Sequence, residues 1–184
     1  MTRLILIRHG ETDWNVEGRW QGHIDVPLNE NGRRHARRLA VELTKAGIQA
    51  IYSSDLTRAL ETARPLAESL GLLIRTDRRL REINLGEWQG LLLTDIQMRH
   101  AELFRSHMAD PLSVASPGGE TALQVEQRAK HALDEILQMH PDETVAIVAH
   151  GFVIAVLRVR LENKRMDQVW DLVPDSAQAI VYDL

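Results

Sequence analysis

The sequence predicts an α/β fold of three layers, an α/β/α sandwich with a mostly parallel central sheet and helices on both faces. Short apolar runs alternate with longer segments whose apolar residues recur every three or four positions, as strands alternate with amphipathic helices. The runs at residues 4–7 and 145–149 contain no polar side chain, which is typical of strands that are buried on both faces. A His-Gly pair follows close behind each run, ending at Gly10 and Gly151.

Size and composition indicate one globular domain over residues 1–184. The chain is 44% hydrophobic and 26% charged, with no cysteine and a net charge of −4. This balance allows an ordinary buried core, and the missing cysteines exclude disulfides and thiol catalysis. The charge gives no reason to expect a nucleic acid or a membrane as partner, and no apolar run is long enough to span a bilayer. We expect a cytoplasmic protein.

The first half of the chain predicts two helices between three strands. Asn29 can cap a helix that continues to a glycine, and residues 48–53 follow as a strand. Ser54 is expected to cap the second helix, which contains Pro65 and should kink there. Residues 72–75 form the third short strand of this prediction.

The second half is less regular at first and then returns to the same alternation. We expect a helix over residues 91–108, a loop rich in proline, serine and glycine, and a long helix with apolar residues from Ala122 to Ile136 on one face. A strand at residues 144–149, a helix at 152–160 and an edge strand at 177–184 complete the prediction. The apolar last strand could pair across a homodimer.

Two distant segments are expected to meet at one site. In an open parallel sheet the ligand binds beyond the carboxyl ends of the strands, where Arg8, His9 and His150 are placed. Arg58 falls in the first turn of the second predicted helix, where its charge adds to the positive end of the helix dipole. Two imidazoles and two guanidinium groups indicate a pocket for a compact dianion such as phosphate, to which Asn15 could add a neutral donor.

Each of these residues also has a structural explanation. A histidine after a strand is often a plain hydrogen-bonding residue, and Arg58 could form a surface ion pair with Glu61 or Asp55. A metal site on His9 and His150 lacks a convincing set of further carboxylates at these strand ends. Exposure to solvent explains the four arginines of the first helix, which lie opposite its apolar stripe: Arg33, Arg34, Arg37 and Arg38.

The aromatic and apolar residues near the site leave two interpretations open. Trp14 and Trp20 flank the first loop and are expected to serve packing more than substrate contact. Another apolar group either walls the mouth of the pocket or forms the core of a small cap: Trp88, residues 91–93, Phe104 and Met108.

Five stretches carry a family resemblance. LILIRHGETDWN, GHIDVPLNENGRRHA, SSDLTRALETA, PGGET and VAHG together resemble the histidine phosphatase superfamily, also called the phosphoglycerate mutase-like family. The resemblance covers essentially the whole chain. It implies the phosphoglycerate mutase-like fold, with residues 83–118 as a cap or specificity insertion.

The resemblance also implies a mechanism. His9 would be the nucleophile that becomes a phosphohistidine, and Glu82 would donate a proton to the leaving group and then accept one from water. Glu87 is the rival for that second role. Arg8, Arg58 and His150 would stabilise the transferring phosphoryl group, so that no metal or other cofactor is needed. The residues expected to contact substrate are Arg8, Asn15, Gln21, Gly22, Arg58, Glu82, His150 and Gly151.

Within the family, the sequence is similar to the phosphatase branch. Cofactor-dependent mutases of the family are longer, carry Arg-His-Tyr after the catalytic glutamate and tend to have asparagine after the second His-Gly pair. Here Ile83, Asn84 and Leu85 follow Glu82, and Phe152 follows the second pair. We therefore expect a phosphatase for small phosphate monoesters, like the broad-specificity and α-ribazole-5′-phosphate phosphatases. The alternatives are a phosphoglycerate mutase and a non-catalytic phosphate-binding module.

Overall fold

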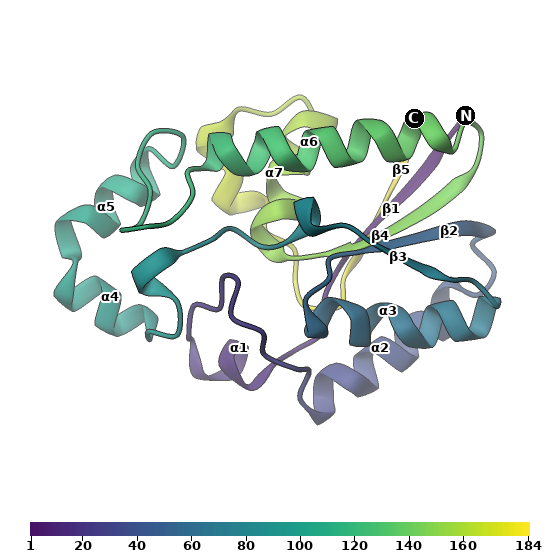
Figure 1. Ribbon diagram of the computed structural model, residues 1–184, viewed down its shortest axis with the longest axis horizontal. Coiled ribbons are helices and arrows are strands. Elements are labelled where there is room, and N and C mark those ends of the chain that lie inside the picture. The colour runs from purple at the N-terminus through teal and green to yellow at the C-terminus, as the bar shows by residue number, and fades with distance from the viewer.

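The computed structural model describes residues 1–184 and contains one five-stranded sheet between two layers of helices (Figure 1). Its elements in chain order are β1 (Arg3–Arg8), α1 (Asp13–Glu17), α2 (Glu30–Leu43), β2 (Ile48–Ser53), α3 (Thr57–Leu70), β3 (Ile74–Thr76), the 3-10 turns η1 (Arg78–Leu80) and η2 (Gly86–Trp88), α4 (Leu93–Arg99), α5 (Ala101–Ala109), α6 (Ala122–Met139), β4 (Thr144–Ala149), α7 (Gly151–Leu161), the 3-10 helix η3 (Met166–Leu172) and β5 (Ala179–Asp183).

The sheet is mostly parallel, as predicted. Its strand order is β3-β2-β4-β1-β5. β4 lies in the middle and pairs in parallel with both β1 and β2, and β3 continues the parallel part beside β2. β5 is antiparallel to β1 and forms one edge of the sheet. The edge position of the last strand is therefore confirmed, whereas the homodimer stays a prediction.

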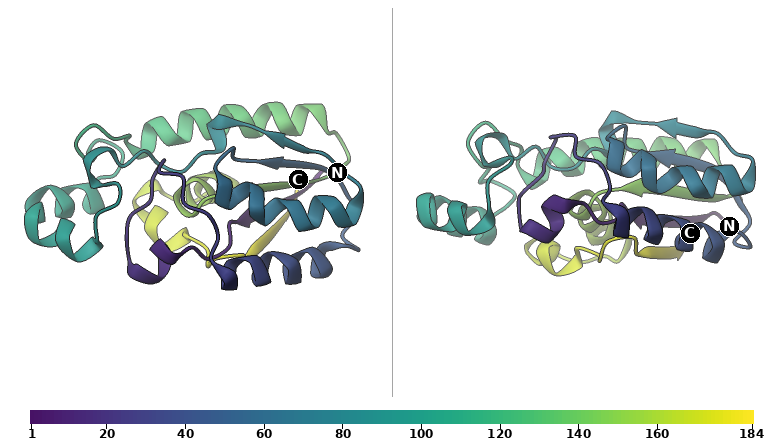
Figure 2. Two further views of the ribbon diagram at one scale, coloured as in Figure 1. Left: turned by 60° about the horizontal axis from the view of Figure 1, so that its bottom comes forward. Right: turned by 90° about the horizontal axis from the view of Figure 1, so that it is seen from below.

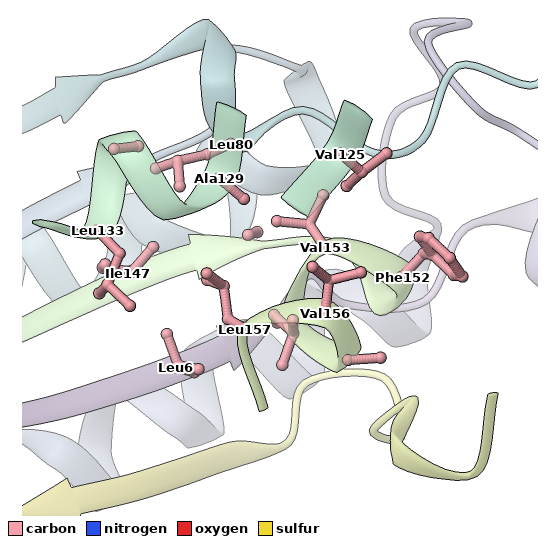
Figure 3. Close-up of a cluster of buried hydrophobic side chains, with 14 of the residues drawn as sticks. Leu6, Leu80, Val125, Ala129, Leu133, Ile147, Phe152, Val153, Val156 and Leu157 are labelled. Carbon is pink, nitrogen blue, oxygen red and sulfur yellow. The ribbon is translucent and has the colours of Figure 1, made fainter. Parts of the chain in front are cut away.

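Alternation along the central strands divides the core between the two faces. Leu4 and Leu6 of β1 pack into the larger apolar cluster, with residues of α6 and α7. Ile5 and Ile7 point the other way, into a smaller cluster with residues of α2 and α3. Figure 3 shows the larger cluster, where the side chains of α7 lie over the sheet. This period of two places helices on both faces and confirms the three layers.

The helices differ in how much of their surface is buried. α2 is amphipathic: Ala36, Leu39 and Ala40 face the sheet, while the arginines at positions 33, 34, 37 and 38 are exposed as predicted. α7 is buried on nearly all sides because the sheet, α6 and η3 surround it. An apolar helix of this kind belongs in a core. None of the helices combines the length and apolar character that crossing a bilayer requires.

Two local predictions are wrong, and long-range contacts explain why. α3 begins at Thr57 with Leu56 at its N-cap position, so Ser54 is not the cap. Instead, the carboxylate of Asp25 accepts hydrogen bonds from the backbone N–H and the hydroxyl of Thr57, both at 2.7 Å. The single helix expected over residues 91–108 is broken at His100 into α4 and α5. The ring of His100 lies against Trp88, with centroids 6.1 Å apart.

Helices α4 and α5 lie beyond the end of the sheet, far from the two chain termini (Figures 1 and 2). They belong to the segment 83–118, and this segment is attached to the main core by buried residues. Trp88 and Ile96 are both fully buried in the cluster shared with α6 and α7. Its role as a cap that sets specificity stays a prediction.

Candidate active site

The two His-Gly pairs lie side by side at the carboxyl end of the sheet. β1 and β4 are neighbours, with Arg8 opposite Ala149 in the parallel register. His9 and His150 follow directly, and their ring centroids are 5.2 Å apart. The structure therefore brings these two distant segments together, as the strand-end argument predicts.

The imidazole of His9 is oriented by its own loop. Its Nδ1 lies 2.7 Å from the carbonyl oxygen of Gly10, to which it donates. In a neutral ring this bond puts the proton on Nδ1 and leaves the Nε2 lone pair unprotonated. Burial, followed by the positive charges of Arg58 and Arg8, lowers the pKa of His9 well below its ordinary value. The ring is thus held in the neutral, nucleophilic form.

The loop that carries His9 is packed tightly against two helices. The N–H of Gly10 donates to the hydroxyl of Thr62 in α3 at 2.9 Å, and this hydroxyl donates to the carbonyl of Arg58. At the start of α2, Gly32 lies so close to the loop that a Cβ atom there would be 2.1 Å from the carbonyl oxygen of Glu11. A glycine is required at this approach.

Arg58 is fully buried and does not form the predicted alternative ion pair. Its Nη atoms donate to the carbonyls of Ile24 and Gly22, and its Nε donates to Nδ1 of His150 at 3.2 Å. Burial lowers the pKa of Arg58 to about 10, which leaves the group charged at neutral pH. A buried cation whose hydrogen-bond partners are all neutral is suited to an anion that arrives from outside.

The bond to Arg58 also decides which nitrogen of His150 carries the proton. A guanidinium N–H can only donate, so Nδ1 of His150 accepts and the ring proton lies on Nε2. This Nε2 is buried and has no partner within the protein. Burial, followed by Arg58 and His9, lowers the pKa of His150 well below its ordinary value. His150 is therefore a neutral donor beside His9.

Arg8 and Gln21 also present unpaired polar atoms. Arg8 donates through Nη1 to the carbonyl of Pro174, while its Nε is buried without a partner. Burial lowers the pKa of Arg8. The side-chain oxygen of Gln21 is likewise unpaired. Asn15 is partly occupied, because its amide oxygen accepts from Thr12 in the capping box of α1.

Glu82 lies at the amino end of α7, where backbone N–H groups hold its carboxylate. It accepts from Ile83 at 3.0 Å, from Phe152 at 3.2 Å and from Val153 at 3.3 Å. These bonds join Glu82 to the turn that follows His150. Glu87, the rival for the acid role, is exposed and does not line the cavity. The geometry therefore favours Glu82.

A side chain of α6, which the sequence did not single out, holds the backbone around Glu82. Arg128 donates through Nε and Nη2 to the carboxylate of Glu120, and through its Nη atoms to the carbonyls of Arg79, Arg81 and Glu82, at 2.6–2.9 Å. All five N–H donors of the guanidinium group are used. Glu120 in turn accepts from the N–H of Asn84 at 2.8 Å, so the backbone is held on both sides of Glu82.

One cavity of 320 Å³ opens over these residues. Of the residues expected to contact substrate, all but His150 line it: Arg8, Asn15, Gln21, Gly22, Arg58, Glu82 and Gly151. The expected nucleophile, His9, lines it as well. His150 lies immediately behind, against the ring of His9. No group of three or more histidine, aspartate or glutamate side chains converges in a way that could hold a metal ion.

The walls of the cavity are where the sequence analysis was least accurate. Trp14 and Trp20 both line the cavity, and Trp20 also packs against Trp88 and the core, as expected. That they serve packing more than substrate contact stays a prediction. Of the apolar group whose role stayed open, Leu93 lines the cavity, whereas Trp88 is fully buried in the core. Wall residues that were not anticipated come from the far end of the chain, at Trp170 and Val173. No local signal marks them.

Comparisons with known proteins identify the family of this chain. The profile of the histidine phosphatase superfamily (branch 1) matches residues 4–184. Phosphoserine phosphatase 1 of Hydrogenobacter thermophilus is 35% identical over 96% of this chain and 84% of its own length. Glucosyl-3-phosphoglycerate phosphatase of Mycobacterium tuberculosis is 40% identical over 86% and 74%, respectively. The solved structure of Bacillus stearothermophilus YhfR is 38% identical, covers 100% of this chain and 92% of its own, and superposes with a TM-score of 0.92. The protein therefore belongs to the histidine phosphatase superfamily.

Proposed function

We propose that the protein is a phosphatase that hydrolyses small phosphate monoesters through a phosphohistidine on His9, without a metal ion. The observation that carries this proposal is the neutral, buried imidazole of His9, whose Nδ1 is held by the Gly10 carbonyl while Arg8 and Arg58 line the same cavity. A nucleophilic nitrogen beside two cations suits attack on a dianionic phosphoryl group.

In the first step Nε2 of His9 attacks phosphorus, the N–P bond forms and the ester P–O bond breaks. Protonated Glu82 gives its proton to the leaving oxygen, which departs as an alcohol. Arg8, Arg58 and Nε2–H of His150 hold the phosphoryl oxygens as charge is redistributed. The arginines and His150 supply the positive charge and the donors that metal ions supply in other phosphoryl-transfer enzymes.

In the second step water attacks the phosphohistidine. The Glu82 carboxylate accepts a proton from this water, the N–P bond breaks, and inorganic phosphate leaves with His9 and Glu82 restored to their starting states. One carboxyl group thus acts first as acid and then as base. Its three backbone hydrogen bonds at the start of α7 support such a role because they fix its position.

The proposal is tested with para-nitrophenyl phosphate in the presence of EDTA. Chelator-insensitive release of phosphate, together with acid-labile radiolabel on the wild type and none on His9→Ala, supports it. Loss of turnover in EDTA, with recovery on adding a divalent ion, would contradict the metal-independent mechanism. α-Ribazole 5′-phosphate belongs in the first substrate panel, because the sequence resembles that branch.

The two alternatives give different results in the same assays. A phosphoglycerate mutase would convert 3-phosphoglycerate into 2-phosphoglycerate faster than it releases phosphate. A non-catalytic module would bind phosphate with no turnover of any ester, and His9→Ala would leave its cellular function intact. The sequence supports hydrolysis over mutase activity, since Ile83, Asn84 and Leu85 stand where the mutases of the family carry Arg-His-Tyr, and the buried Phe152 stands where they tend to carry asparagine.

A further inference from the structure

The cavity is lined by two chemically different sets of residues. The polar set surrounds His9 and is described above. The second set is apolar and comes from well-separated parts of the chain, namely α1, the loop after it, the segment 83–118, α7 and η3. Its main members are Trp14, Trp20, Leu85, Leu93, Phe152 and Trp170. We call these six residues the apolar wall.

Aromatic contacts hold three members of the apolar wall in place before any ligand binds. The rings of Phe152 and Trp170 lie 4.6 Å apart between centroids, and Trp20 lies 6.5 Å from Trp170. Behind them, Trp20 meets the fully buried Trp88 edge-on at 5.9 Å. Side chains packed in this way have little freedom to withdraw, so a ligand meets a preformed apolar surface.

Charge is nearly absent from this part of the cavity. Outside the polar set, the one charged residue in the lining is Arg19. Its Nε forms an ion pair with Glu17, and its Nη1 donates to the carbonyl of Gly90 at 2.9 Å. A carboxylate on the leaving group would therefore find, outside the polar set, only a cation already paired with Glu17, and an ammonium group would find no carboxylate other than Glu82. Burying either charge without a partner is unfavourable.

We propose that the site selects phosphate esters of uncharged alcohols with an apolar or aromatic body. The inference rests on the proposed function, since it names the leaving group of that reaction. The expected substrates differ from those in the names of two relatives, phosphoserine and glucosyl-3-phosphoglycerate. The alcohol part of each of those two esters carries a carboxylate. Contact with the apolar wall favours the neutral ester, while desolvation penalises the charged ones.

Three benzyl esters test this with equal chemistry at the reacting atoms: benzyl phosphate, para-carboxybenzyl phosphate and para-trimethylammoniobenzyl phosphate. We expect kcat/KM for the neutral ester to exceed that of each charged one by about tenfold or more. Equal or faster turnover of either charged ester overturns the proposal. If instead the proposed function itself is wrong, the result is distinguishable, because none of the three esters would then label His9.

A variant pair locates the effect within the cavity. Leu93→Arg places a cation at the start of α4 in the lining, and we expect it to raise kcat/KM for the carboxylate ester about tenfold relative to benzyl phosphate. Met98→Arg is the matched control, since Met98 lies on the same helix with 73% of its surface exposed and outside the lining. An unchanged ratio in folded Leu93→Arg would show that this wall does not contact the leaving group, and would overturn the assignment.

Discussion

Replacing Arg128 by lysine tests whether the position of Glu82 depends on a side chain that does not touch the substrate. Lysine keeps the positive charge but offers three donors from a single atom, whereas Arg128 makes five hydrogen bonds from a planar group. At least two bonds are therefore lost. The side chains of Arg128 and Glu120 are only 18% and 21% exposed, so water replaces these bonds incompletely.

The structure sets the size of the expected effect. Two lost hydrogen bonds lower the free energy of unfolding by about 1–3 kcal/mol, which leaves a protein of ordinary stability folded. A shift of about 1 Å in a positioned group can reduce the rate about 100-fold. We expect kcat/KM for alkyl phosphates to fall by about 10- to 100-fold, or about 1.4–2.7 kcal/mol of transition-state stabilisation.

The assay is kcat/KM across phosphate esters whose leaving groups range from para-nitrophenol to simple alcohols. Since para-nitrophenolate leaves without a proton, Arg128→Lys should affect that ester least and alkyl esters most, as Glu82→Gln should. Arg160→Lys is the control, because Arg160 pairs with Asp134 with its side chain 40% exposed. The positioning argument is refuted if Arg128→Lys lowers kcat/KM by the same factor for every ester while Glu82→Gln shows the leaving-group dependence.

Three further predictions concern the histidines and the loop beside them. His9→Ala should lower kcat/KM by about 1000-fold or more and abolish acid-labile labelling; residual labelling elsewhere would point to another nucleophile. Because the pKa of buried His150 lies well below that of the unfolded chain, only the unfolded state takes up its proton near pH 6. The free energy of unfolding should therefore decrease as the pH is lowered. His150 should contribute about 1.4 kcal/mol of this decrease between pH 7.5 and pH 5.5. In urea unfolding at the two pH values, His150→Gln should show a smaller decrease in the free energy of unfolding, by that amount. A pH dependence equal to that of the wild type would contradict the assigned neutral ring. Gly32→Ala should destabilise by about 2 kcal/mol or more, since its Cβ would press on the carbonyl of Glu11; a change in urea midpoint within error would show that the loop relaxes.

The sequence predicted the central sheet well because its signal is local. The strands expected at residues 48–53 and 144–149 are β2 and β4 with the same bounds. For β4, the unbroken apolar run at residues 145–149 marks a strand buried on both faces. Asn29 caps α2 as expected, with its side chain accepting from Gly32. Ser54 fails as a cap because Asp25, far away in the sequence, performs that role.

In the candidate site too, the sequence predicted the features that depend on local patterns and missed those that depend on long-range contacts. Strand-end placement was enough to bring His9 and His150 together, because the order of strands and turns constrains where parallel strands end. The tautomers were not predictable, since they depend on single hydrogen bonds to Gly10 and from Arg58. Nor was most of the apolar wall predictable, because its members come from well-separated parts of the chain. Of these six residues, only Leu93 falls in a stretch that the sequence analysis offered as a possible wall of the pocket.

The sequence by itself determined the layered fold, the two imidazoles at the strand ends and the cations near them. These features follow from the periodicity of apolar residues and from the alternation of strands and helices, which neighbouring residues encode. Only the tertiary structure decided which ring nitrogen of each imidazole carries the proton, what holds Glu82 in place and which apolar side chains line the cavity. Those features depend on contacts between residues far apart in the chain, such as the bond from Arg128 to the Glu82 carbonyl, and no local pattern encodes such partners.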